Sequence, residues 1–354
     1  MLEAIYCSYF ACVPHYIGGS LRAGIIIVGS GRMGSIHAEN IRRSGMAELV
    51  AIVDTDEERA RKASERFGAP YYLDLERAII NNKAKTHGVV IASPLTAHLD
   101  GIRIACDHGL HIFVEKPLAP SISQCREAVS IVKKAGVFLQ IGYQRRYDKS
   151  YKEVKRSIDV GDIGRPFIAK FIARDPMPDP GIGIGSLYSG AIFDDMLTHE
   201  FDLTSWFFGF PPISIYAVGR TMCFKTGDYD NVLVVMEYSG GPLVSIEATR
   251  CSVYGHDLRL EILGEKGLLK LENIPEHSVH MYGRDNIARH PRLPWFAERF
   301  SEAYYKEIEI FIGSIILGER PTPNEEDGLR ACAISDAAKR SAIERRPVTL
   351  SEML

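Results

Sequence analysis

The sequence has no uninterrupted apolar run as long as a membrane-spanning helix requires. It also lacks an excess of charge of one sign. Its 42 basic and 45 acidic side chains give a formal net charge of −3, and the basic residues are scattered. Because nucleic acid and anionic membrane surfaces are bound by concentrated positive charge, we expect neither as a partner. The 354 residues are enough for two domains with cores of their own.

Cysteine occurs seven times, but no two cysteines have the Cys-x-x-Cys spacing of a redox or zinc motif. Because the number is odd, a reduced chain in the cytoplasm is the simpler expectation. His277 and His280 form a lone His-x-x-His with no further ligand nearby in the sequence. A surface turn is therefore favoured over a metal site, and no metal is expected.

Residues 1–23 do not match a targeting signal. They are apolar and aromatic, but Glu3 and Pro14 interrupt the run, and Arg22 is the only basic side chain. A secretory signal needs a basic start and a continuous apolar core, and a transit peptide is rich in arginine. We therefore treat residues 1–23 as an N-terminal extension of unknown role.

Residues 24–145 alternate between short apolar runs and helical stretches. The first runs are Ile25–Val28 and Leu49–Val53, and strands are expected again at 88–91, 111–114 and 137–141. Helices are expected up to Ser44 and at 56–67, 74–82, 96–108 and 121–135. Strands buried on both faces appear as continuous apolar runs, and their alternation with helices is typical of a doubly wound parallel sheet. The pattern predicts an α/β domain over 24–145.

Residues 146–354 have a different pattern, in which most of the strands follow one another without crossover helices. Strands are expected at 167–174, 213–223, 231–238, 243–250, 258–263 and 267–271, and helices near 148–159, 301–317 and 325–343. Ser239–Pro242 has the composition of a turn and predicts a hairpin. The second domain is therefore expected to be α+β, with an open, mainly antiparallel sheet.

A glycine motif, GSGRMG, lies between the first strand and the first helix. Glycines allow a tight turn and the close approach of a pyrophosphate, and the helix N-terminus offers free N–H groups. The motif predicts a dinucleotide site. Its expected cofactor-binding residues are Gly29, Gly31, Arg32, Met33 and Gly34. His37, in the first turn of the helix, is expected to pack or to support the site.

Asp54 ends the second strand, 20 residues after Gly34. A carboxylate at this position accepts hydrogen bonds from the adenine-ribose hydroxyls and repels a 2′-phosphate, which predicts NAD as the cofactor. NADP stays possible, because Arg42, Arg43 and Arg59 would weaken this preference. The alternative role for Asp54 is a helix cap or a solvated loop acid.

Glu115-Lys116-Pro117 follows the strand at 111–114. Proline keeps the residue before it extended, so Lys116 should project from the carboxyl edge of the sheet, where such folds bind ligands. An ammonium there can hold a substrate hydroxyl and stabilise developing alkoxide charge. The alternative is a solvated surface lysine.

Residues 193–207 are expected to form a largely buried helix in which Asp195, His199 and Asp202 share one face. A carboxylate one turn from an imidazole orients the ring and stabilises its protonated form. His199 would then be a general base for a hydroxyl proton. The alternative is a structural Asp–His hydrogen bond in the core.

Taken together and in this order, the motifs resemble the Gfo/Idh/MocA oxidoreductase family, and within it the inositol 2-dehydrogenases. Further segments carry the likeness. They are Ala92–Pro94, Gln140–Asp148, Ile262–Gly267, Tyr305–Glu309 and Glu326–Gly328. The resemblance implies a Rossmann domain, a substrate-binding and oligomerisation domain, and hydride transfer from a ring carbon to NAD. It also implies a tetramer or dimer whose sheets pack face to face.

The resemblance also implies roles for individual residues. Lys116, Asp195 and His199 match the catalytic residues of the family and would also contact substrate. Ser93, Pro94, Glu115 and Lys116 would join the cofactor site, and Gln144, Arg145, Asp202 and His256 would line or support the substrate pocket.

Two of these positions depart from the inositol enzymes, which often carry methionine in place of Gln144 and tyrosine in place of His256. The expected substrate is a cyclic polyol, foremost myo-inositol oxidised to 2-keto-inositol. A glucose- or galactose-type sugar dehydrogenase and a non-catalytic cofactor-binding sensor are the alternatives. Met177–Ser189, rich in glycine and proline, is a candidate pocket-lining loop.

Overall fold

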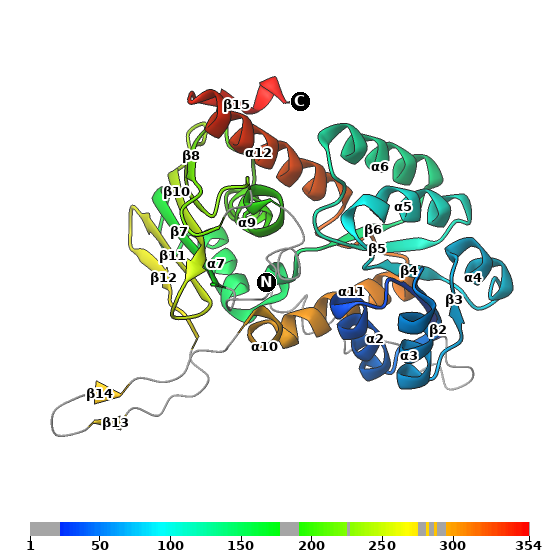
Figure 1. Cartoon of the computed structure of the whole chain (residues 1–354). Helices are drawn as coiled ribbons and strands as arrows, with labels where there is room; N and C mark the ends of the chain where they lie inside the picture. The colour runs from blue at the N-terminus through cyan, green and yellow to red at the C-terminus, as the bar shows by residue number, and fades with distance from the viewer. Residues whose placement is uncertain are drawn as a thin grey trace.

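The computed structural model describes residues 22–177, 191–224, 227–274, 295–353 and the backbone of 281–282 and 287–288. Most of the N-terminal extension, the candidate loop from residue 178 onward and the His277/His280 pair lie outside these residues. The described chain forms two lobes, each built on one large sheet (Figure 1). Among the described residues, no helix is long and apolar enough to cross a membrane.

The first lobe is a parallel six-stranded sheet of order β3-β2-β1-β4-β5-β6. Its strands are β1 (Ala23–Val28), β2 (Ala47–Val53), β3 (Tyr71–Tyr72), β4 (Gly88–Ile91), β5 (His111–Glu115) and β6 (Leu139–Gly142). Its helices are α2 (Arg32–Ser44), α3 (Glu57–Phe67), α4 (Leu75–Asn81), α5 (His98–Asp107) and α6 (Ile122–Ala135). The predicted doubly wound sheet is confirmed, and only the two-residue edge strand β3 was not anticipated.

The second lobe is a seven-stranded sheet of order β12-β11-β7-β10-β9-β8-β15. Its strands are β7 (Pro166–Pro176), β8 (Ser214–Arg220), β9 (Asn231–Glu237), β10 (Leu243–Ser252), β11 (Asp257–Gly264), β12 (Leu268–Leu271) and β15 (Val348–Thr349). Only β7 and β10 pair in parallel, so the prediction of a mainly antiparallel sheet is confirmed, as is the β9–β10 hairpin. A small hairpin, β13 (Met281–Tyr282) and β14 (Ile287–Ala288), stands apart from this sheet.

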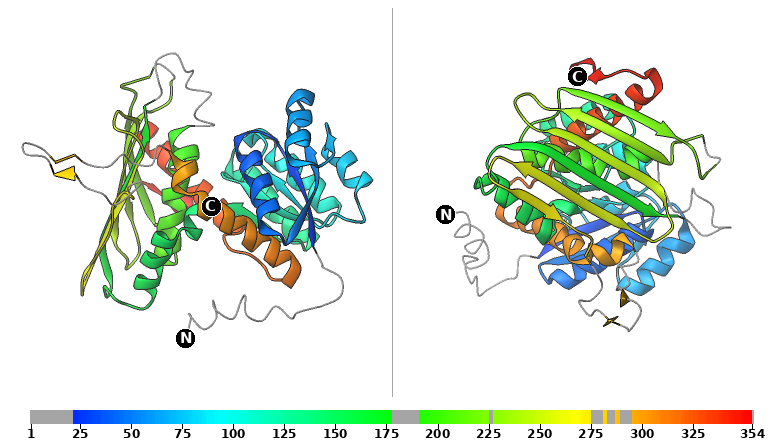
Figure 2. Two further views of the ribbon diagram at one scale, coloured as in Figure 1. Left: turned by 90° about the horizontal axis from the view of Figure 1, so that it is seen from below. Right: turned by 90° about the vertical axis from the view of Figure 1, so that its left-hand side faces the viewer.

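Helices fill the space between the two sheets (Figure 2, left). They are α7 (Lys149–Asp159), the π-helical turn η3 (Ile192–Met196), α9 (Thr198–Phe208), α10 (Phe296–Arg299), α11 (Ser301–Leu317) and α12 (Glu325–Glu344). The sequence assigns α11 to the second domain, yet Ile308, Phe311 and Ile312 complete a core of the first lobe together with Ile25 and Phe113. The lobes are therefore joined by packing as well as by the chain.

One cysteine pair corrects the expectation of a fully reduced chain. Cys223, after β8, and Cys251, near the end of β10, form a disulfide with a Cα–Cα distance of 6.6 Å. Strand pairing through β9 brings the two positions together, which their separation of 28 residues does not suggest. Cys106, Cys125 and Cys332 are buried free thiols.

Candidate active site

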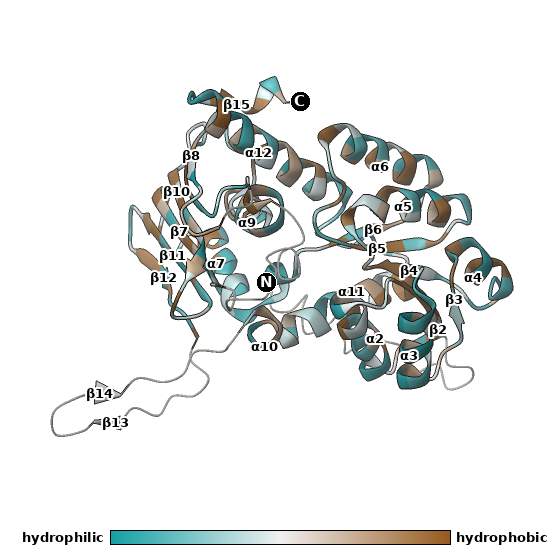
Figure 3. Ribbon diagram, viewed as in Figure 1, coloured by the Kyte–Doolittle hydropathy of each residue, from teal (hydrophilic) through white to brown (hydrophobic). Residues whose placement is uncertain are grey.

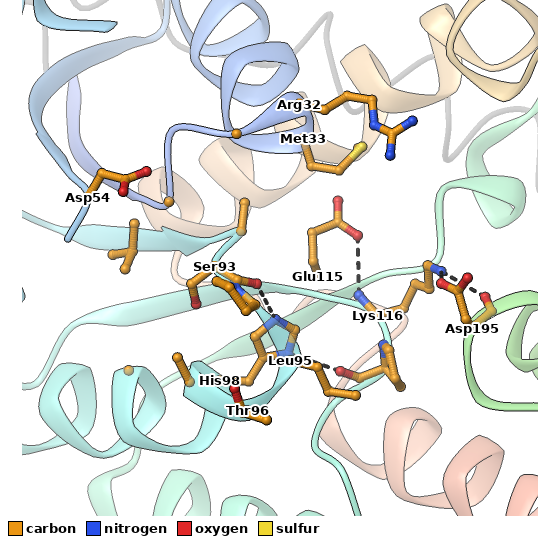
Figure 4. Close-up of a pocket in the computed structure, with 18 of the residues that line it drawn as sticks. Arg32, Met33, Asp54, Ser93, Leu95, Thr96, His98, Glu115, Lys116 and Asp195 are labelled. Atoms are coloured by element: carbon orange, nitrogen blue, oxygen red, sulfur yellow. Dashed lines mark hydrogen bonds and ion pairs between the residues drawn. The ribbon is translucent and has the colours of Figure 1, made fainter. Parts of the chain in front are cut away.

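A cavity of about 920 Å³ lies between the lobes, at the carboxyl ends of the first-lobe strands (Figure 4). Fourteen of the expected site residues line it: Gly29, Gly31, Arg32, Met33, Asp54, Ser93, Pro94, Glu115, Lys116, Gln144, Arg145, Asp195, His199 and His256. Two do not line it, Gly34 and Asp202. The structure thus gathers residues from both lobes around one space.

The glycine loop fits a dinucleotide. Gly29 has a φ of +92°, and a Cβ on Gly34 would lie 1.8 Å from the Gly29 oxygen, so both glycines are required by the loop and the helix packed on it. A Cβ on Gly31 would meet no atom within 4 Å. Gly31 is also the N-cap of α2, and no side chain caps that helix. Open space in front of uncapped N–H groups is what a pyrophosphate needs.

Asp54 follows β2, lies beside the glycine loop and is 8% exposed. Its carboxylate accepts hydrogen bonds from the Ser30 N–H (2.9 Å), the Ser30 hydroxyl (2.8 Å) and the Asp56 N–H (2.9 Å), and it pairs with Arg59 at 3.0 Å. Burial acts to raise its pKa, but these hydrogen bonds, foremost that of Arg59, lower the pKa of Asp54 to about 2. The side chain that caps α3 is Asp56, which argues against the capping alternative for Asp54.

Lys116 reaches across the cavity from the first lobe. Its Nζ donates to the backbone oxygen of Asp195 at 2.7 Å and to Oδ1 of Asp195 at 2.9 Å (Figure 4). Arg250 Nη2 donates to the second carboxylate oxygen, Oδ2, at 3.1 Å. The two cations fix the Asp195 carboxylate, and that carboxylate in turn fixes the ammonium. This contact excludes the alternative of a freely solvated lysine.

His199 lies in the first turn of α9, whereas Asp195 lies in η3, so the expected single α-helix is wrong here. The chain makes a π turn before α9 begins at Thr198. Burial, followed by the positive charges of Arg145 and Lys116, lowers the pKa of His199 well below its usual value. This corrects the expectation that Asp195 stabilises a protonated ring: His199 is neutral, the form that accepts a proton.

Asp202 is one turn further along α9 and faces away from the cavity. It is buried and accepts from Arg146 Nε at 2.9 Å, and Arg146 also bonds Asp327 at 3.0 Å. The neighbouring Arg145 instead lines the cavity and pairs with the buried Glu200. Asp202 thus supports the wall of the cavity through Arg146 rather than lining it.

Sequence reasoning missed several residues of the cavity. Asp175, near the end of β7, lies with its Oδ1 3.7 Å from His256 Nε2, and burial raises its pKa to about 6. Its position at a strand end, like that of Asp54, is a signal that could have found it. Four aromatic residues of the cavity have no such local signal, and neither has Arg250, which holds Asp195 without lining the cavity itself. The aromatic residues are Trp295, Phe296, Phe300 and Tyr304.

Comparisons with known proteins give a consistent result. Residues 23–143 match the family model described as an oxidoreductase family with an NAD-binding Rossmann fold, and residues 155–350 match the C-terminal α/β domain of the same family. The chain is 33% identical over 338 residues to myo-inositol 2-dehydrogenase of Thermotoga maritima, covering 94% of this chain and 100% of that one. It is also 33% identical over 330 residues to inositol 2-dehydrogenase of Rhizobium meliloti, covering 92% and 98%.

A solved structure extends the likeness to a ligand complex. Scyllo-inositol dehydrogenase from Lactobacillus casei, crystallised with NAD(H) and scyllo-inositol, superimposes with a TM-score of 0.85 at 27% identity. The match covers 93% of this chain and 99% of that one.

Proposed function

The chain belongs to the Gfo/Idh/MocA family of NAD-dependent oxidoreductases, and from this premise we propose that it oxidises a ring hydroxyl of a cyclic polyol, foremost myo-inositol to 2-keto-inositol. The observation that carries the proposal is the contact of Lys116 with Asp195 across the cavity, with a neutral His199 in the same wall. A cofactor-binding sensor would need the glycine loop but not this arrangement.

Each catalytic residue of the chain has a separate role in this reaction. NAD, when bound, supplies the acceptor for the hydride. The Lys116 ammonium, oriented by Asp195, donates a hydrogen bond to the substrate oxygen and stabilises the alkoxide charge that develops on it. His199, kept neutral, takes the hydroxyl proton. The aromatic side chains of Trp295, Phe296, Phe300 and Tyr304 line the cavity and would exclude water from it.

The polar lining near Lys116 favours a substrate with many hydroxyl groups. Gln144, Arg145, Asp175 and His256 all line this part of the cavity. They offer both hydrogen-bond donors and acceptors, which suits ring hydroxyls that act as both. Arg145 and His256 are buried, and Nε of Arg145 has no hydrogen-bond partner within the described chain. An apolar alcohol would leave such desolvated polar atoms unpaired, so it is disfavoured.

A substrate panel tests the proposal. Purified protein is incubated with NAD and, separately, myo-inositol, scyllo-inositol, glucose and galactose, and the absorbance of reduced cofactor is followed. We expect the highest kcat/KM with an inositol. A higher value with a sugar would favour the sugar dehydrogenase, and tight NAD binding without turnover on any substrate would favour the sensor.

We further propose a homo-oligomer, a tetramer or dimer, joined through the outer face of the second sheet (Figure 2, right). Exposed apolar side chains lie in cross-strand rows on this face. They are Ile168, Leu243 and Leu263 in one row and Tyr216, Val218, Leu233 and Val235 in the neighbouring strands. Figure 3 shows the apolar character of these strands. An apolar patch of this extent is typical of a protein interface.

We also place the enzyme in the cytoplasm, where NAD is regenerated by metabolism. Thiols there are mostly reduced, as those of Cys106, Cys125 and Cys332 are, and the Cys223–Cys251 disulfide would be an exception. Cell fractionation followed by immunoblotting checks the placement: the chain should be recovered with the cytoplasmic fraction, and its recovery from a secreted or periplasmic fraction would contradict the placement.

A further inference from the structure

Three titratable side chains meet in the interior behind the strand that leads to Lys116. His37 comes from α2, Glu115 from β5 and Glu307 from α11, and their nitrogen and oxygen atoms lie within 4.8 Å of one another. His37 and Glu307 are fully buried, and Glu115 is 8% exposed. His37 Nε2 lies 2.6 Å from Glu115 Oε1. Both carboxyl oxygens of Glu307 and Nδ1 of His37 have no hydrogen-bond partner within the described chain.

The cluster holds protons rather than a metal ion. Two ligands around one tetrahedral Zn²⁺ are about 3.3 Å apart, because each lies roughly 2.0–2.1 Å from the metal. The 2.6 Å contact between His37 and Glu115 is shorter and is that of a charge-assisted hydrogen bond. Burial, followed by the charge of Glu115, raises the pKa of Glu307 well above its usual value. Two carboxylates this close do not both ionise in the interior, so Glu307 holds a proton.

Among the described residues, no hydrogen bond to the carboxyl group of Glu307 fixes its protonation state. Gln140 Nε2 donates to the backbone oxygen of Glu307 at 2.8 Å and not to its carboxyl group. Tyr304, from the same helix, feels the charges of Glu115 and Glu307, and the more distant Arg32 and Arg145 act in the opposite direction on it. Burial raises the pKa of Tyr304 well above its usual value, so this phenol stays neutral.

Of the three residues in this cluster, only Glu115 lines the cavity. In Figure 4 its carboxylate lies between Arg32 and Met33 of the cofactor loop and Lys116 of the catalytic end. Its Oε2 also accepts from the Lys116 N–H at 3.2 Å. A nicotinamide cofactor bound between the glycine loop and Lys116 would lie near this carboxylate.

We propose that the proton on Glu307, held in this cluster beside His37 and Glu115, sets the charge of the cluster and thereby makes the preference of the cavity for oxidised over reduced nicotinamide depend on pH, with Glu307 and His37 as positioning residues. The oxidised ring carries one positive charge and the reduced ring none, so a more negative cluster favours the oxidised form. When the reduced form binds instead, the cluster takes up a proton from solvent. The inference rests on the proposed function, because it requires NAD in this cavity.

The sign of the effect follows from this linkage. As pH rises, the cluster loses protons and becomes more negative, so NAD⁺ binds more tightly relative to NADH. One fully coupled proton changes the ratio of the two dissociation constants tenfold per pH unit. Because Glu307 acts on the cavity from behind Glu115, its proton is only partly coupled, and we expect a change of about threefold per pH unit.

The experiment measures dissociation constants of NAD⁺ and NADH by calorimetry on the full-length protein between pH 6 and 9. The variants are Glu307→Gln, which fixes a neutral side chain of the same shape, and Glu302→Gln, a matched control on the exposed side of α11. We expect the ratio Kd(NADH)/Kd(NAD⁺) to rise with pH in the wild type and the control, and to be nearly flat in Glu307→Gln. The His37→Asn variant should also remove most of the pH dependence of this ratio, and it is the independent test if Glu307→Gln does not fold.

The outcomes separate the two proposals. An unchanged slope in both Glu307→Gln and His37→Asn overturns the role of the cluster. NAD⁺ and NADH binding with no pH slope in the wild type overturns it too but leaves the proposed function intact. Absence of binding of either cofactor form by the wild type would overturn both.

Discussion

Replacing Asp54 with asparagine should shift the cofactor preference from NAD towards NADP. The carboxylate is ionised at neutral pH, because its pKa is about 2, and it faces the cofactor cavity. A hydrogen bond from a ribose hydroxyl to a charged group contributes about 1.5–3 kcal/mol, so the Asp54→Asn variant should bind NAD roughly 10- to 100-fold more weakly. Asparagine keeps the volume and one acceptor oxygen.

The gain for NADP depends on Arg59, which the substitution releases from its 3.0 Å pair with Asp54. The Arg59 side chain is 56% exposed. Its attraction for a 2′-phosphate is therefore near the aqueous limit of about 1 kcal/mol, or roughly fivefold in affinity. Loss of the Asp54–phosphate repulsion adds a similar factor. Together the changes should move the NAD/NADP specificity ratio by at least a hundredfold.

The assay compares kcat/KM for the two cofactors, followed by the absorbance of the reduced form. Glu58→Gln is the control, since it removes the same charge four residues further along the chain, in α3, where the side chain is exposed and paired with Lys62. An Asp54→Asn variant in which both cofactors lose affinity by the same factor, at an unchanged melting temperature, would refute the role given to the carboxylate.

Four further changes test the site and the fold. Lys116→Met should lower turnover by on the order of a hundredfold or more at unchanged NAD affinity, and near-normal turnover would contradict its role. Burial raises the pKa of Asp175 to about 6, so this carboxylate takes up a proton as the pH drops through 6, and kcat/KM should fall with it. In a pH profile of the Asp175→Asn variant, this fall on the acid side should be absent. Asp202→Ala removes one buried partner of Arg146, which should lower the free energy of unfolding by about 3–5 kcal/mol. Calorimetry should show a lower Tm, and the KM should not change. A raised KM at an unchanged Tm would make Asp202 a substrate ligand. Leu233→Lys should reduce the mass seen in sedimentation, and an unchanged mass would exclude the sheet face as the interface.

Where the sequence misled, a contact between distant segments outweighed a local pattern. The i, i+4 spacing of Asp195 and His199 suggested one helix and one couple, but Lys116 and Arg250 hold Asp195 from outside the segment. The same helix pattern put Asp202 on one face with Asp195 and His199, although Arg146 holds it away from the cavity. Local spacing indicates which residues can share a face, and it does not indicate which partners reach that face.

The sequence by itself determined the two kinds of sheet, most element boundaries and the dinucleotide loop. These depend on the alternation of apolar residues and on glycines near each other in the chain, and they follow from backbone geometry within a few residues. Only the tertiary structure decided the charge of His199, the partners of Asp195 and the cluster around Glu307. Lys116 meets Asp195 across 79 residues, His37 meets Glu115 across 78, and Arg250 meets Asp195 across 55. Burial and the charges of such neighbours set the protonation of a side chain, and both exist only after the chain has folded.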